Sequence, residues 1–481
     1  MSEAGSEGGG VQPGSSPSPD GTTAPSPDAT ARVPAEGAGE AAASETGSAS
    51  APVSSPLETP GAPPVAPDSK FTGTAAPEKK PKKKRKWLRR IGCLFALFPV
   101  FLLALWIAIH KIDGFGPWLA NLGRSIVGND AIAKLEDWAY GMQDKVNLAT
   151  RGDEKPATAW EVTPRKERPK DDAGTPAPTK YPELEIKDVG PMLQSFSAPG
   201  DGVWVPMVDE RFPDEPAHML KTLLHPDAKR GWAQVAVVAI DLRQVDLHLI
   251  AGTIEPVTTL ADAKAHKRTG LIPPDDLGSA IAAFNGGFMA THGHYGMKSE
   301  GVVWIEPHPK SCTIVMQPSD VISIRSWEEL SSKESEYVWY RQTPMCMVES
   351  GALHPGLTME ENTYWGATLD KETIIRRSAM GISEDGKTLF VGIGEATSAV
   401  AIAKAMQFAG SFHVAQLDVN FSYPKFVSIG PKSPGASDLE LKGLVKTFEF
   451  KPDDYIKRPH TRDFFYLTRL PLPLQKDAPK P

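Results

Sequence analysis

The chain has 481 residues, more than the roughly 100–200 residues of one ordinary domain. Its net charge of −7 argues against a surface that binds nucleic-acid phosphates. Three cysteines exclude a disulfide-dense scaffold and a multi-cysteine zinc module. The 45 prolines and 42 glycines gather in particular segments, which indicates an extended polar part beside a globular part.

Residues 1–78 consist mainly of Ala, Gly, Ser, Thr and Pro, and they contain very few large apolar side chains. A segment of this composition cannot bury enough apolar surface to offset the conformational entropy that folding removes. We therefore predict a disordered tail over residues 1–78. The Pro- and Lys-rich end of the chain, 471–481, is expected to be a loose tail as well.

Residues 79–90 read KKPKKKRKWLRR, and the next nineteen residues carry no charge. A helix of that length spans about 28 Å, close to the thickness of a bilayer's hydrocarbon core. The basic run also resembles a nuclear import signal, and a cleaved signal peptide is a third interpretation, although no cleavage motif follows. We favour a transmembrane helix over 91–110, because a basic segment beside an apolar span stays in the cytosol. The N-terminus is then cytoplasmic and the C-terminal domain extracytoplasmic, which suggests the periplasmic side of a bacterial inner membrane.

Residues 111–194 are expected to connect the membrane span to a domain. Spaced apolar residues between 117 and 149 predict a short amphipathic helix that lies either on the membrane or on the domain. The charged, Pro-rich stretch 151–182 is typical of a linker.

The composition from 195 to 470 is that of a globular domain. Residues 397–409 form an apolar helical face that ends at a glycine, and a short strand is expected over 414–418. Further strands are predicted over 233–240, 245–250, 279–284, 301–305, 312–316, 374–382 and 388–393. This pattern predicts a mixed α+β fold, strand-rich with few helices. Cys312 and Cys346 fall in this domain, either as one disulfide or as two buried thiols.

Several motifs lie at strand ends. Asn285, Gly286 and Gly287 follow an apolar strand, where the glycines permit either a hairpin turn or the close approach of a ligand. Arg377 lies in a strand that precedes an Asp-Gly turn. Asp418 ends a strand, where an acid can line a pocket or cap a turn.

The order of FNGGF, then GVV at 301–303, then RSAMGI, then a helix followed by LDVN resembles the phosphodiester glycosidase family. This family includes N-acetylglucosamine-1-phosphodiester alpha-N-acetylglucosaminidase, which uncovers mannose-6-phosphate on lysosomal proteins, and many bacterial exopolysaccharide-associated proteins. The resemblance covers about 230–430 and implies hydrolysis of a sugar-1-phosphodiester at the anomeric carbon. It assigns the pocket to Asn285, Gly286, Gly287, Arg377 and Asp418.

The sequence departs from that family after Asp418, where Val419-Asn420-Phe421-Ser422 replaces Gly-Gly-Gly-Ser. Three glycines would permit close approach of the backbone to a phosphate, and Val and Phe do not. The substrate is therefore expected to differ, or the activity to be lost. Asn420 is a candidate substrate-binding residue of this variant.

Cleavage at the anomeric carbon passes through an oxocarbenium-like state and needs charge stabilisation on the departing phosphate. We expect Arg377 to hold the phosphate oxygens, because a guanidinium binds them through two bonds. Asp418 is the candidate nucleophile or base, with Glu300 as a second carboxylate. Asn285 is expected to hydrogen-bond to a sugar hydroxyl or a phosphate oxygen.

His292, His294 and Lys298 follow the glycine turn. A His-x-His pair can bind a metal, but no third ligand stands at a fixed spacing, so we expect no metal and no cofactor. The three residues are candidates for binding substrate, against the alternative of an ordinary surface loop.

These observations predict a membrane-anchored hydrolase that acts on a sugar-1-phosphodiester linkage of an envelope or exopolysaccharide glycan. The alternative is a protein that binds a glycan or assists polysaccharide assembly on the same fold without catalysis. The expected partners are a glycan or sugar-phosphate substrate and a membrane, which one helix crosses. No nucleic-acid partner is expected.

Overall fold

The computed structural model describes residues 129–163 and 183–471, except 214, 359–364, 366–372 and 434, together with scattered positions between 100 and 126. The predicted disordered tail and the basic segment lie outside these residues. So do most of the predicted membrane span and nearly all of the predicted C-terminal tail. In the described part of the chain, no helix is both long enough and apolar enough to cross a membrane.

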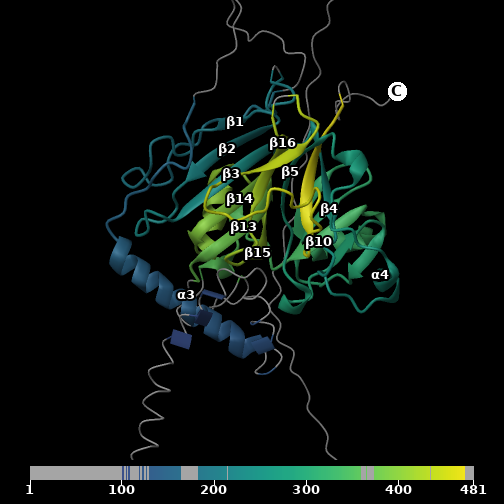
Figure 1. Ribbon diagram of the computed structural model, residues 1–481, viewed down its shortest axis with the longest axis horizontal. Helices are drawn as coiled ribbons and strands as arrows, with labels where there is room; N and C mark the ends of the chain where they lie inside the picture. The colour runs from purple at the N-terminus through teal and green to yellow at the C-terminus, as the bar shows by residue number, and fades with distance from the viewer. Residues whose placement is uncertain are drawn as a thin grey trace, which may run out of the picture. The chain divides into compact units, whose positions relative to one another are not determined.

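The described residues form three antiparallel β-sheets with a few helices (Figure 1). The first sheet contains, in spatial order, β1 (Val205–Met207), β2 (Met219–Leu224), β3 (Gln234–Asp241), β14 (Thr388–Thr397), β13 (Ile375–Ile382), β15 (His413–Val419), β11 (Val348–Glu349) and β12 (Ala352–Leu353). The second contains β7 (Val302–Ile305), β6 (Met297–Ser299), β10 (Trp339–Thr343), β8 (Cys312–Met316) and β9 (Ile322–Ser326). The third contains β17 (Leu439–Gly443), β16 (Phe426–Pro431), β5 (Ala280–Asn285), β18 (Phe464–Arg469) and β4 (Val245–Ile250).

The helices of the described region are short, apart from the first. They are α3 (Asn129–Arg151), α4 (Ala261–Ala265), α5 (Trp327–Leu330) and α6 (Ala399–Phe408). Single turns of 3₁₀-helix cover Pro274–Asp276, Ala290–His292, Ser331–Glu336 and Pro355–Leu357. The predicted strand-rich α+β architecture is confirmed, with antiparallel pairing between all the strands of the three sheets.

The first sheet is buried on both faces at its centre, which explains why β3 is almost uniformly apolar. Val235 and Val237 of β3 belong to the core cluster that includes α6, whereas Ala236 and Val238 belong to the cluster shared with the other sheets. This alternation follows from the two-residue period of a strand. The sheet therefore forms a layer between two cores.

Helix α6 packs closely on the first sheet because a strand glycine makes room for it. A Cβ atom on Gly392 of β14 would lie 2.4 Å from the sulfur of Met406. The Ser398 hydroxyl accepts a hydrogen bond from the Ala401 N–H and so caps the start of the helix. This confirms the helix that the apolar spacing over 397–409 predicts.

Cys312 and Cys346 form a disulfide, so the second of the two alternatives, two free thiols, is excluded. The bond joins the first residue of β8 to the segment that follows β10. Their Cα atoms are 4.7 Å apart.

Segments before residue 195 also contact the domain. Leu184 is buried in the core that includes α6, and the Lys221 ammonium lies over the Trp160 ring at 4.5 Å. Asp144 of α3 forms an ion pair with Arg230 at 2.6 Å. The packed region therefore begins earlier along the chain than the predicted boundary.

Candidate functional site

Three strand ends meet around the side chain of Asn285, the last residue of β5. Its Nδ2 donates to the Ser378 hydroxyl at 2.8 Å, and that hydroxyl donates to the Asp418 carbonyl oxygen at 2.8 Å. Its Oδ1 accepts from the Lys425 N–H at 3.1 Å. Because both ends of the amide are engaged and the side chain is fully buried, Asn285 holds the strands together.

The β13–β15 ladder shifts register beside Asp418, between Arg377 and Ala379. A bulge of this kind re-aims the side chains next to it. The Asp418 N–H donates to the Gly286 carbonyl at 3.2 Å, which ties the end of β15 to the glycine turn after β5.

Gly286 and Gly287 are required by the protein's own packing. A Cβ on Gly286 would lie 2.1 Å from Oδ2 of Asp463, and one on Gly287 would lie 2.7 Å from Cζ of Arg341. The Gly287 N–H donates to Asp463 Oδ2 at 2.9 Å. The glycines therefore admit a buried ion pair between Arg341 and Asp463, whose Nε–Oδ2 distance is 2.8 Å.

The Asp418 carboxylate is only 2% exposed and forms an ion pair with Arg462, with 2.6 Å between Nη1 and Oδ2. Asn420 Nδ2 donates to the same oxygen at 2.9 Å. Burial raises the pKa of Asp418 to about 6, although the Arg462 charge opposes the shift. A carboxyl group with a pKa in this range is suited to proton transfer near neutral pH.

Asn420, which stands where the family pattern has glycine, also folds the loop after Asp418. Its Oδ1 accepts from the N–H groups of Ser422 at 2.9 Å and Tyr423 at 2.6 Å. Its amide thus closes a turn and orients the Asp418 carboxylate at the same time.

Arg462, the ion-pair partner of Asp418, is itself mostly buried. Its side chain is 14% exposed, and its guanidinium lies over the Tyr423 ring at 3.8 Å. Nη2 donates to the Gly287 carbonyl at 3.2 Å. Nε has no hydrogen-bond partner among the described residues. This guanidinium is the cation next to the buried carboxylate, and Nη1 and Nη2 are both engaged within the protein.

Arg377 does not occupy that position, which corrects the prediction that its guanidinium joins Asp418 and Asn285 in one site. It donates to the carbonyls of Trp365, Thr373 and Thr397 and to Gln416 Oε1, at 2.9–3.1 Å. Among the described residues, no hydrogen bond or ion pair joins it to Asp418. The physical reason is strand alternation, because Ser378 faces the site and its neighbour Arg377 faces the other side of β13.

The remaining candidates lie apart from Asp418. Glu300 occupies the turn between β6 and β7 and accepts from the Ala251 N–H at 3.3 Å. Within the described ranges, no bond joins it to Asp418. Lys298 donates to the Tyr337 carbonyl at 2.7 Å, and His292 and His294 are exposed. No group of three metal-ligating side chains occurs in the described part of the chain.

Sequence reasoning missed Arg462, Asp463, Arg341 and Tyr423. The signal for the first two was present: the opposite charges of Arg462 and Asp463 directly precede the apolar run of β18. Charged residues at a strand end are candidates for a site, as Asp418 is. Nothing local distinguishes Arg341 or Tyr423, because their partners are distant in sequence.

A family model described as a protein of unknown function (DUF3963) matches residues 78–108, and no protein with a curated description matches the chain. Similar solved structures include the catalytic domain of zebrafish N-acetylglucosamine-1-phosphodiester alpha-N-acetylglucosaminidase, auto-inhibited by its pro-peptide. That domain is 12% identical, and the match covers 55% of this chain and 87% of the zebrafish chain with a TM-score of 0.34. A hypothetical protein from Synechocystis is 8% identical over 54% of this chain and 65% of its own, with a TM-score of 0.26. At these scores neither structure assigns an activity to the chain.

Proposed function

We propose that this protein is a membrane-anchored hydrolase that cleaves a sugar-1-phosphodiester linkage of an envelope or exopolysaccharide glycan. The observation that carries the proposal is the buried Asp418 carboxylate, whose pKa is raised to about 6, in contact with Arg462, whose side chain is 14% exposed. The order of the sequence motifs around Asn285 and Asp418 supports the same reaction.

The chemistry divides between these two side chains. Arg462 holds the phosphate oxygens of the substrate and stabilises the charge that develops on them as the bond to the anomeric carbon breaks. Asp418 acts at that carbon, as a nucleophile or as the base for water. In this assignment Arg462 has the phosphate-binding role that the motif alone gives to Arg377.

The second candidate is a glycan-binding or polysaccharide-assembly protein without catalysis. The low exposure of Asp418 and its closed ion pair with Arg462 favour it, because the carboxylate reaches a substrate only if the pair opens. An uncharged ligand at Arg462 would leave both the guanidinium and the Asp418 carboxylate without an opposite charge, which is costly. An anionic group such as a phosphate is therefore the ligand that can compete for Arg462.

Phosphorus NMR of the full chain in detergent, with a panel of sugar-1-phosphodiesters, tests the reaction directly. Hydrolysis converts a phosphodiester signal into a phosphomonoester signal. The hydrolase proposal is supported if Asp418→Asn abolishes turnover. The control variant Lys404→Met changes an exposed residue of α6 and should leave turnover intact. Binding without turnover across the panel would favour the second candidate.

The membrane anchor rests on the basic segment 79–90 and the uncharged segment that follows it. A reporter fused after residue 200 should be active only outside the cytoplasm. Reporter activity in the cytoplasm would reject this topology and would leave the proposed chemistry of Asp418 unaffected.

A further inference from the structure

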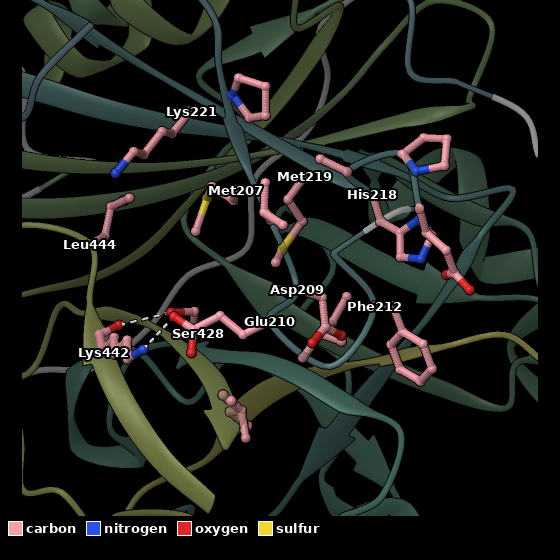
Figure 2. A pocket seen from close by; sticks show the side chains of 18 of the residues that line it. Met207, Asp209, Glu210, Phe212, His218, Met219, Lys221, Ser428, Lys442 and Leu444 are labelled. Atoms are coloured by element: carbon pink, nitrogen blue, oxygen red, sulfur yellow. Dashed lines mark hydrogen bonds and ion pairs between the residues drawn. The ribbon is translucent and has the colours of Figure 1, made fainter. Parts of the chain in front are cut away.

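A cavity of about 300 Å³ lies between the first and third sheets, away from Asp418. Its walls come from β1 and β2 and the segment that joins them, and from β16 and β17 (Figure 2). This volume is at the lower end of the range for sites that bind small molecules. None of the residues of the Asp418 site lines it.

The middle of the cavity is apolar. Met207 of β1 and Met219 of β2 lie side by side there, and Ile281, Ile429 and Leu444 also line it. Methionine side chains are flexible and polarisable, so they adapt to ligands of different shape. The cavity can therefore receive a hydrocarbon body.

Every carboxylate that lines the cavity has a basic partner. Asp209 pairs with Arg211 at 2.9 Å, and Glu210 pairs with Lys442 at 2.7 Å. Glu215 pairs with Arg469. These pairs balance the acidic charge of the wall, so the acids do not define a cation site.

Lys221 is the cation that remains after this pairing. Among the described residues it has no ion-pair partner, and its ammonium lies over the Trp160 ring at 4.5 Å. Burial lowers the pKa of Lys221, and among the described residues no carboxylate offsets this effect of burial. An anionic group on a ligand would supply that compensation.

His218 provides a polar group at the other side of the methionines. It is 7% exposed, and its Nδ1 has no hydrogen-bond partner among the described residues. Burial and the nearby Arg469 charge lower the pKa of His218, which favours the neutral form of its ring. Figure 2 shows Lys221 and His218 on opposite sides of Met207 and Met219.

We propose that this cavity binds a small amphipathic monoanion, with its carboxylate at Lys221, its hydrocarbon body over Met207 and Met219, and a hydroxyl group at the His218 ring. This site is independent of the Asp418 site, and its occupation does not depend on the proposed hydrolase activity.

Isothermal titration calorimetry of the full chain with octanoate, 1-octanol and 8-hydroxyoctanoate tests each part of the proposal. We expect octanoate to bind more tightly than octanol, because only octanoate pairs with Lys221. Lys221→Met should weaken octanoate binding about tenfold or more and leave octanol unchanged. The hydroxyl of 8-hydroxyoctanoate should improve affinity over octanoate, and His218→Phe should remove that gain.

Lys404→Met is the matched control, since Lys404 is an exposed lysine of α6 that does not line the cavity. If Lys221→Met fails to fold, salt serves instead: raising the ionic strength should weaken octanoate binding to the unsubstituted protein and spare octanol. Equal affinities for octanoate and octanol, or no binding of any probe at millimolar concentration, would overturn the proposal.

Discussion

Replacing Asp418 by Asn should change how the stability of the domain depends on pH. Burial raises the pKa of Asp418 from 3.8 to about 6. The folded state therefore holds a proton that the unfolded chain releases near pH 4, and this stabilisation is present below pH 4 and lost as the pH rises through about 6. Two pKa units correspond to about 3 kcal/mol. An Asn side chain at position 418 has nearly the same size as Asp and has no titratable group.

Urea unfolding at pH 4 and at pH 7 measures this effect. Between these two values, the wild type should lose about 2 kcal/mol of unfolding free energy more than Asp418→Asn does, because the unfolded Asp418 is already partly ionised at pH 4. Asp320→Asn is the control for removing one carboxylate, because Asp320 lies in an exposed turn at positive φ, where Asn is well tolerated. If the free energy of unfolding varies with pH in the same way for the wild type and for Asp418→Asn, the raised pKa of Asp418 would be refuted.

Four further outcomes are expected. Arg462→Lys should lower turnover of a phosphodiester in the phosphorus NMR assay, since an ammonium cannot bind two oxygens in a fork; unchanged kcat/KM would exclude Arg462 from phosphate binding. If Asp418 acts ionised, kcat/KM should rise with pH through about 6, so a flat profile would count against that role. Arg341→Met leaves the Asp463 carboxylate buried without its partner and should cost about 3–5 kcal/mol in urea unfolding, and a cost below 1 kcal/mol would contradict that pairing. Reducing the Cys312–Cys346 disulfide, whose cysteines are 34 residues apart in the sequence, should cost up to about 4 kcal/mol in urea unfolding, measured as the difference between the oxidised and the reduced wild type.

Many strands were predictable from the sequence, because each is a short run of apolar residues that can be recognised without knowing its partners. The run over 233–240 corresponds to β3, and the runs over 245–250 and 312–316 match β4 and β8 residue for residue. Both ends of such strands are marked by turn residues. The grouping of these strands into three sheets was not predictable, because it depends on pairings between segments far apart in the sequence.

The candidate site was predictable only in part, for a similar reason. Asn285, Asp418 and Asn420 stand at strand ends, and the structure brings them together. The identity of their cationic neighbour depended on which face of β13 carries Arg377, and a bulge beside that residue sets the geometry. Periodicity places a side chain on one of two faces, but it does not say which face meets the site.

The position of β18 has a consequence for how the chain reaches its folded state. This strand is near the end of the domain, yet it inserts between β5 and β4 of the third sheet, and it directly follows Arg462 and Asp463. Neither the third sheet nor the Asp418–Arg462 pair is complete until that last segment has been synthesised and has docked. Pairings of such high sequence separation form slowly. A chain interrupted before residue 460 would expose the edges of β5 and β4 and would lack the guanidinium of the site, so incomplete products should be both inactive and prone to aggregate.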